Sequence, residues 1–260
     1  MTNDPTYLPI LMYHGIRGSG SEQIHAGWSR RHAIDAASFA GQLDVVARSG
    51  LRTLALADLD RPSLSRQPLF ITFDDGHSSD YSIAAPALRQ RGLTGTFFVT
   101  WSFLGRRGYL DRVQVRELRA QSFEIGSHGL SHKKLTQVGA AELWCEALDS
   151  KRRLEDLIGE EISSFAIPSG SYNDPVLQAL WAAGYRRIMT SDFGYARLED
   201  SVMHRMGVMA ETTPRQFQAF LTAGPSWAAR HRLLEGIKRR LRRAVAGAGT
   251  IPPTRRQPVA

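Results

Sequence analysis

The sequence Leu69-Phe70-Ile71-Thr72-Phe73-Asp74-Asp75-Gly76 decides the fold of this 260-residue chain. Its apolar part follows Pro68 and is too short for a helix, so it predicts a buried strand over Leu69–Phe73. Asp74 and Asp75 then lie at the carboxyl end of that strand, where α/β folds place their ligands. Two adjacent carboxylates repel each other unless a cation or a proton lies between them. Taken alone, the motif fits a ligand site and a simple helix cap equally well.

A second strand has the same form near the start of the chain. In Pro9-Ile10-Leu11-Met12-Tyr13-His14-Gly15 an apolar run ends in a histidine and a glycine. Other predicted strands alternate with predicted helices along the chain, which indicates parallel βαβ units in an α/β barrel or a doubly wound sheet. The strands are Arg52–Leu56, Gly95–Thr100, Phe123–His128, Ser163–Ile167, Tyr185–Thr190 and His204–Val208; the helices are Phe39–Ser49, Ser82–Gln90, Val113–Ala120, Ala140–Ile158 and Asp174–Ala183, with a short one after Thr213.

Composition limits the class of protein. With 42% hydrophobic and 22% charged residues, the chain fits one globular domain with a small appendage. The single cysteine, Cys145, excludes an intrachain disulfide and a cysteine-based metal site, and its helical context predicts a buried thiol. No stretch of about 18 apolar residues predicts a membrane span. Because no secretory signal is visible, we expect a cytoplasmic protein that can also bind peripherally at the inner membrane face; a different start of the chain, and export, stays the alternative.

The excess positive charge lies at the C-terminus. Residues 226–260 hold nine Lys and Arg and one acid, against a formal net charge of +8 for the whole chain. The rest of the protein is therefore neutral, and the basic composition does not indicate nucleic-acid binding.

A metal site is indicated by Gly126-Ser127-His128-Gly129-Leu130-Ser131-His132. Two imidazoles four residues apart, after an apolar strand, can bind one ion, although a solvated pair is the commoner outcome of this spacing. One aspartate of the central motif would complete an Asp-His-His set on one side of the ion. Such a set leaves coordination positions open for water and substrate, as in catalytic sites.

Together these stretches resemble the polysaccharide deacetylase family, the NodB-homology enzymes of carbohydrate esterase family 4 type. The resemblance rests on Thr72–Gly76, Ser127–His132 and Phe165–Asn173, in matching order and spacing, and covers Pro9 to Leu221. Leu11–Gly15 is similar to the subgroup that includes the poly-N-acetylglucosamine deacetylases, whose catalytic histidine motif lies near the N-terminus. No Leu-x-x-His motif occurs late in this chain, in keeping with that subgroup.

The resemblance implies a distorted (β/α) barrel and metal-dependent hydrolysis of N-acetyl groups on an amino-sugar glycan. Asp75, His128 and His132 would hold a divalent ion, usually Zn²⁺, whose bound water attacks the acetyl carbonyl. Asp74 would be the general base, and His14 the general acid that protonates the leaving amine. The metal and the backbone N–H of Ser169 would stabilise the oxyanion.

The third motif departs from the family pattern. Many family members carry an arginine before the proline of this motif and a large residue after it. Here Ile167 and Ser169 stand in those two places, and no arginine lies in Ser163–Ser169. Orientation of Asp74 by an arginine is therefore unassigned, and we interpret His77 as solvated. Three aromatic residues are candidates for stacking on sugar or for packing, namely Trp101, Tyr109 and Tyr172.

We expect a catalytic domain over residues 1–224, a basic amphipathic helix over 225–246 and a disordered tail over 247–260. Leu233, Leu234, Ile237, Leu241 and Val245 recur at helical spacing opposite a basic face. The apolar stripe either packs on the barrel or lies on an anionic membrane, near lipid-linked glycans.

The function expected first is a polysaccharide N-deacetylase of exopolysaccharide biosynthesis whose partner is an acetylated glycan and not a nucleic acid. An amidase of the same fold, acting on a non-sugar amide or imide, would be separated from it by substrate profiling. A catalytically silent glycan-binding protein is disfavoured because Asp74, Asp75, His128 and His132 are all present. A non-enzymatic membrane-tethered protein would need the segment after Gly224 but not Asp74.

Overall fold

The computed structural model describes residues 7–18, 29–60 and 67–234. Its core is a closed ring of seven parallel strands, ordered β1-β10-β9-β8-β7-β6-β5, which the pairing of β1 with β5 closes. The predicted (β/α) barrel is thus confirmed, and the doubly wound alternative is excluded. The ring strands are β1 (Ile10–Tyr13), β5 (Pro68–Phe73), β6 (Thr96–Val99), β7 (Glu124–Ser127), β8 (Ser164–Ala166), β9 (Arg187–Phe193) and β10 (Val202–Gly207). Three short strands stand outside it, β4 (Arg52–Thr53) on β5, and β2 (Ile16–Arg17) paired with β3 (Ile34–Asp35).

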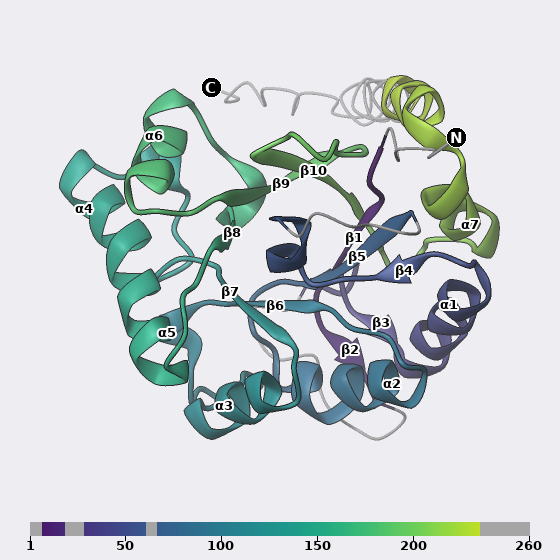
Figure 1. Ribbon diagram of the computed structural model, residues 1–260, viewed down its shortest axis with the longest axis horizontal. Coiled ribbons are helices and arrows are strands. Elements are labelled where there is room, and N and C mark those ends of the chain that lie inside the picture. The colour runs from purple at the N-terminus through teal and green to yellow at the C-terminus, as the bar shows by residue number, and fades with distance from the viewer. Residues whose placement is uncertain (1–6, 19–28, 61–66, 235–260) are drawn as a thin grey trace, which may run out of the picture.

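Helices surround this ring on its outer side (Figure 1). They are α1 (Ala36–Arg48), α2 (Ala85–Gln90), α3 (Arg112–Ala120), α4 (Ala140–Trp144), α5 (Ser150–Ile158), α6 (Asp174–Ala182), α7 (Pro214–Thr222) and a last helix over 224–234. Two π-helical segments continue them, η2 (Asp80–Ala84) before α2 and η5 (Cys145–Asp149) between α4 and α5; short 3-10 segments are η1 (Leu56–Asp60), η3 (Trp101–Phe103), η4 (Leu135–Gln137) and η6 (Pro168–Gly170). In the described part of the chain, none of these helices has the length and apolar character needed to cross a bilayer.

Helix starts follow local capping chemistry. The Asp35 carboxylate accepts a hydrogen bond from the backbone N–H of Ser38 at 2.9 Å and caps α1. Helix α6 begins at Asp174, the first residue of its predicted range, with Asn173 as the cap whose side-chain oxygen accepts the N–H of Val176. Asp174 occupies the first turn, where its charge favours the helix dipole.

Strand alternation separates an inner from an outer core. Alternate strand residues such as Ile10, Phe70 and Phe98 point into the barrel and form one buried cluster. Their neighbours, such as Leu11 and Ile71, pack against the helices in the larger cluster. Since side chains alternate along a strand, the same two-residue period continues past the strand ends and selects which polar residues face the barrel mouth.

One glycine makes room for the inner core. A Cβ on Gly126 would lie 2.5 Å from the ring of Phe98 and 2.8 Å from Oγ of Ser164. The glycine therefore lets Phe98 fill the barrel directly below the candidate metal ligands.

The helical run from α4 to α5 corrects one expectation. Cys145 is exposed on η5, whereas the neighbouring Glu146 is buried, so the π-helical turn presents the acid and not the thiol to the core.

At the end of the described chain, Leu233 and Leu234 on the helix over 224–234 are 65% and 56% exposed. The remainder of the predicted segment 225–246 and the tail 247–260 lie outside the described residues.

Candidate active site

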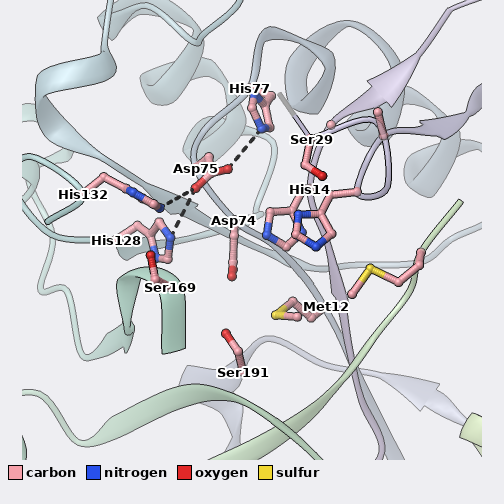
Figure 2. Close-up of a pocket in the computed structure, with 14 residues that line it drawn as sticks. Met12, His14, Ser29, Asp74, Asp75, His77, His128, His132, Ser169 and Ser191 are labelled. Atoms are coloured by element: carbon pink, nitrogen blue, oxygen red, sulfur yellow. Dashed lines mark ion pairs between the residues drawn. The ribbon is translucent and has the colours of Figure 1, made fainter. Parts of the chain in front are cut away.

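The polar residues at the barrel mouth continue the inward-facing rows of their strands. His14 lies two residues after Met12, Asp74 two after Thr72, and His128 two after Gly126. They converge on a cavity of about 340 Å³, which Asp75, His132 and Ser169 also line. Figure 2 shows Asp74 between the two histidines of the His-x₃-His motif on one side and His14 on the other. All six residues expected from the sequence therefore meet in one cavity.

Asp75, His128 and His132 form a compact set of three donors. Oδ1 of Asp75 lies 3.3 Å from Nε2 of His128 and 3.1 Å from Nε2 of His132. One ligand atom from each residue lies within 4.8 Å of the other two. Two imidazole nitrogens and one carboxylate oxygen are the donor set of catalytic zinc and related divalent ions.

The local chemistry of these residues fits a cation. Oδ1 of Asp75 is buried and has no hydrogen-bond partner among the described residues, which is costly unless a positive charge satisfies it. Nδ1 of His128 lies 2.8 Å from the carbonyl oxygen of Ala166. Because a carbonyl only accepts, Nδ1 carries the proton and the lone pair of Nε2 is left to bind a metal.

Backbone strain is concentrated at this site. Asp75, His132 and Ser169 have φ values of 77°, 60° and 59°, in the left-handed region that non-glycine residues rarely occupy. Only one other non-glycine residue in the described ranges, Ser122, has a positive φ. Such strain, worth about 1–3 kcal/mol per residue, persists where surrounding contacts over-determine the backbone.

Arg205 provides the arginine that the third motif lacks. Its guanidinium donates two parallel hydrogen bonds of 2.7 Å to the two carboxylate oxygens of Asp74. It also donates to the carbonyl of Thr190 and to Oγ1 of Thr72, and its side chain is completely buried. A β-bulge shifts the pairing of β9 and β10 just before Arg205. The sequence offered only one signal for this role, a charged residue inside an otherwise apolar strand.

The guanidinium of Arg205 holds Asp74 ionised. Burial opposes its ionisation, but the charge and the hydrogen bonds of Arg205 act in the opposite direction, and the pKa of Asp74 is lowered. Each of its oxygens keeps a second lone pair beside the bond from Arg205, so the carboxylate can still accept a proton. Its position is therefore fixed while its capacity to accept a proton remains.

His14 is held neutral in the free site. Burial lowers the pKa of His14 to about 4, although the charges of Asp74 and Asp75 act in the opposite direction. Its ring stacks on that of His32 at 4.5 Å between centroids and 15° between planes. His32, which also lines the cavity, was not singled out from the sequence, because nothing local marks it as close to His14.

One expectation about a neighbouring side chain needs correction. His77 is buried and not solvated: its Nε2 lies 3.2 Å from Oδ2 of Asp75, and its ring stacks on Tyr109 at 5.1 Å. The three aromatic candidates for sugar stacking are absent from the cavity lining. Trp101 lies instead beneath the guanidinium of Arg112 at 5.1 Å, and the Tyr172 hydroxyl donates to Asp192 at 2.9 Å.

The loop between His128 and His132 is held by a buried acid. The carboxylate of Glu146 accepts the backbone N–H groups of Leu130 at 2.8 Å and Ser131 at 3.0 Å, and the hydroxyl of Ser131. The acid reaches this loop from the π-helical turn η5, a local widening that is frequent near functional sites. It positions the backbone that carries His132.

Replacing Glu146 by Ala is expected to lower the free energy of unfolding by about 2 kcal/mol, because two backbone N–H groups lose their acceptor. Zinc affinity should fall about tenfold, since His132 loses its support. Urea unfolding and zinc titration measure the two effects. Glu142→Ala is the matched control, because Glu142 lies on the same helical run and pairs with Lys133 at the surface. Equal losses of unfolding free energy and zinc affinity in the two variants would contradict the positioning role assigned to Glu146.

The lowered pKa of His14 makes the metal-free protein sensitive to acid. Between pH 6.5 and about 4 the unfolded chain binds a proton that the folded site refuses, so stability is complete above this window and falls as the pH drops through it. Between pH 7 and pH 4.5 the chelator-treated protein should lose about 2–3 kcal/mol more than the His14→Gln variant. Urea unfolding at both pH values tests this; identical losses would show that His14 is not desolvated.

Known proteins share this sequence pattern and fold. Residues 61–188 match the family described as polysaccharide deacetylase. The chain is 26% identical over 229 residues to YxkH of Bacillus subtilis, which is named as a polysaccharide deacetylase, covering 85% of this chain and 78% of that protein. It is 31% identical over 122 residues to the peptidoglycan-N-acetylglucosamine deacetylase of Bacillus cereus, covering 46% of this chain and 55% of that protein.

Solved structures share the fold. The Streptococcus pyogenes deacetylase PplD, in complex with acetate, aligns with a TM-score of 0.73 at 24% identity, covering 82% of this chain and 96% of that one. IcaB from Ammonifex degensii aligns with a TM-score of 0.69 at 23% identity, covering 83% and 96%. The motifs, the barrel and these relatives together give this chain the sequence pattern and the fold of the polysaccharide deacetylase family.

Proposed function

We propose that this protein removes N-acetyl groups from an amino-sugar glycan by metal-assisted hydrolysis. The observation that carries the proposal is the convergence of a three-donor cation site with an arginine-held carboxylate and a partly buried histidine in one cavity. Relatives that are named as deacetylases of peptidoglycan and of chitooligosaccharide support the substrate class. The N-terminal position of His14 suits a subgroup of the poly-N-acetylglucosamine deacetylase type, and with it a role in exopolysaccharide biosynthesis.

Asp75, His128 and His132 would hold the divalent ion, which we take to be Zn²⁺. When bound, it polarises the acetyl carbonyl and lowers the pKa of water toward neutrality. Asp74 does not belong to this set, and its pairing with Arg205 keeps it ionised and aimed into the cavity. In the proposed reaction, Asp74 accepts a proton from the attacking water.

His14 is proposed to protonate the leaving nitrogen with a proton that it takes up from solvent, while the proton that Asp74 accepted is released to solvent at the end of the turnover. His14 is neutral in the free site, and the two carboxylates that raise its pKa already face it. A reacting oxyanion adds negative charge beside them, so the imidazole becomes protonated at the stage when the amine leaves. Ser169 lines the same cavity with its backbone in a left-handed conformation, and its N–H is proposed to donate to the oxyanion.

The C-terminal segment is proposed to bring the enzyme to an anionic membrane face. Its basic excess supplies the charge, and the exposed Leu233 and Leu234 supply apolar contacts. Binding to vesicles of anionic phospholipid, compared with neutral vesicles, tests this contact. A protein that binds neither kind of vesicle would contradict it.

The deciding experiment combines metal content with acetate release. About one zinc per chain is expected in the wild-type protein and much less in His128→Ala, measured by elemental analysis. Acetate release from chitooligosaccharides and peptidoglycan should depend on that metal and stop with a chelator. Faster release of carboxylate from non-sugar amides would indicate the amidase, and glycan binding without acetate release would indicate the silent binding protein. Absence of metal after loading would contradict the hydrolytic mechanism.

A further inference from the structure

A second cavity of about 360 Å³ adjoins the catalytic one, and its volume is within the usual range of ligand sites. Met12, Ser191 and Met209 line both cavities, so the two lie side by side. We call the second one the His231 cavity, because the helix over 224–234 contributes His231 to its wall. Its other lining residues are Arg31, Phe193, Gly207, Glu211, Thr212, Gln216 and Phe220.

One wall of the His231 cavity is aromatic. The rings of Phe193 and His231 stack at 4.8 Å between centroids and 26° between planes. Trp227 supports both from behind, at 6.1 Å from Phe193 and 5.1 Å from His231. Both lining rings are only partly buried, so a ligand can reach them. The exposed parts of the two stacked rings give the cavity an apolar wall, which suits the apolar face of a sugar ring.

The polar part of the lining carries no net charge in the part of the chain that the structure describes. Arg31 and Glu211 are the only permanently charged lining residues, and they pair with each other at 2.7 Å. Ser191, Thr212 and Gln216 add neutral hydrogen-bonding groups. The cation that could bind a carboxylated or phosphorylated sugar, Arg31, is already paired with Glu211. An uncharged sugar meets hydrogen-bond donors, acceptors and an apolar aromatic wall.

We propose that the His231 cavity binds the sugar unit next to the one that loses its acetyl group, and that this unit is uncharged. The inference rests on the proposed deacetylase function and extends it to the length of the substrate. Because His231 belongs to the helix over 224–234, the proposal makes this helix part of the glycan site. The exposed Leu233 and Leu234 lie on the same helix. A glycan chain that leaves the metal site would therefore run toward this helix.

The test compares His231→Ala with Arg230→Ala, an exposed neighbour on the same helix that does not line the cavity. With tri-N-acetylchitotriose, His231→Ala should raise KM about tenfold and change kcat little, while Arg230→Ala keeps both. With 4-nitrophenyl acetate, which needs only the metal site, all three proteins should have equal rates. An unchanged KM for the trisaccharide, or an equal loss on both substrates, would overturn the inference.

Calorimetric binding separates this inference from the proposed function. Wild-type protein should bind the chitotriose more tightly than the His231→Ala variant, and more tightly than a hyaluronan oligosaccharide in which each N-acetylglucosamine neighbours a glucuronate. Equal binding by the variant overturns the cavity assignment alone, and equal or tighter binding of hyaluronan overturns the uncharged unit. A wild-type protein that neither binds nor deacetylates the chitotriose overturns both the deacetylase and the cavity.

Discussion

Replacing Asp74 by Asn is expected to lower acetate release about a thousandfold while zinc stays bound. The amide keeps the size of the side chain but cannot accept the proton of water, and loss of a positioned general base costs about 10²–10⁴-fold in rate. Zinc should remain because Asp74 is not one of the three donors that converge at the cation site. The measurement is kcat for chitooligosaccharide deacetylation beside the zinc content of the same sample.

Asp75→Asn is the matched comparison, since it changes the adjacent carboxylate in the same way. It should lose zinc and activity together, because Oδ1 of Asp75 lies against both histidine nitrogens. The two variants therefore separate a base from a ligand. An Asp74→Asn protein that keeps more than a tenth of the activity, or that loses its zinc, would show that the roles are assigned wrongly.

Replacing Arg205 by Met should have the largest effect on stability. The side chain is completely buried, and its removal leaves the Asp74 carboxylate buried without its cation. Breaking a buried ion pair from one side typically costs about 3–5 kcal/mol of unfolding free energy. Activity should fall as well, because Asp74 loses both its orientation and the charge that lowers its pKa.

Two further variants show whether this cost comes from the unpaired charge. Arg186→Met removes an exposed arginine that also holds a carboxylate, that of Glu161, through two bonds, and it should change stability by less than about 1 kcal/mol. The double variant Arg205→Met with Asp74→Leu should be more stable than Arg205→Met alone, because no buried charge is left unpaired. Urea unfolding checks all three. A double variant as unstable as the single one would place the cost in packing.

The residues in these two predictions differ in whether their positions could be predicted from the sequence alone. Asp74, Asp75, His128 and His14 each stand next to a glycine or at the end of an apolar strand, so their place at the barrel mouth follows from local pattern. The parallel alternation then brings strand ends to one edge, whatever the details of register. For this reason the parallel βαβ architecture and the strand-end positions of the three candidate ligands were predictable, whereas the choice of a barrel over a doubly wound sheet came from the family resemblance.

Other features depended on which strands become neighbours. Arg205 and Asp74 are 131 residues apart, and they meet only because β10 and β5 flank β1 in the closed ring. His32 reaches His14 through the short pairing of β3 with β2, and His77 is buried by packing against Tyr109. None of these residues carries a local signal of its partner.

The sequence by itself therefore determined the parallel βαβ units, the strand-end positions of the reactive groups and the candidate donor set for a metal, and the family resemblance implied the barrel. The sequence could do so because two-residue alternation and glycine-marked strand ends are local properties of the chain. Only the tertiary structure decided the arginine that holds Asp74, the stack of His14 on His32 and the aromatic wall beside the site. These depend on ring closure, strand register and long-range packing, in which residues far apart in sequence become neighbours and set each other's charge and burial.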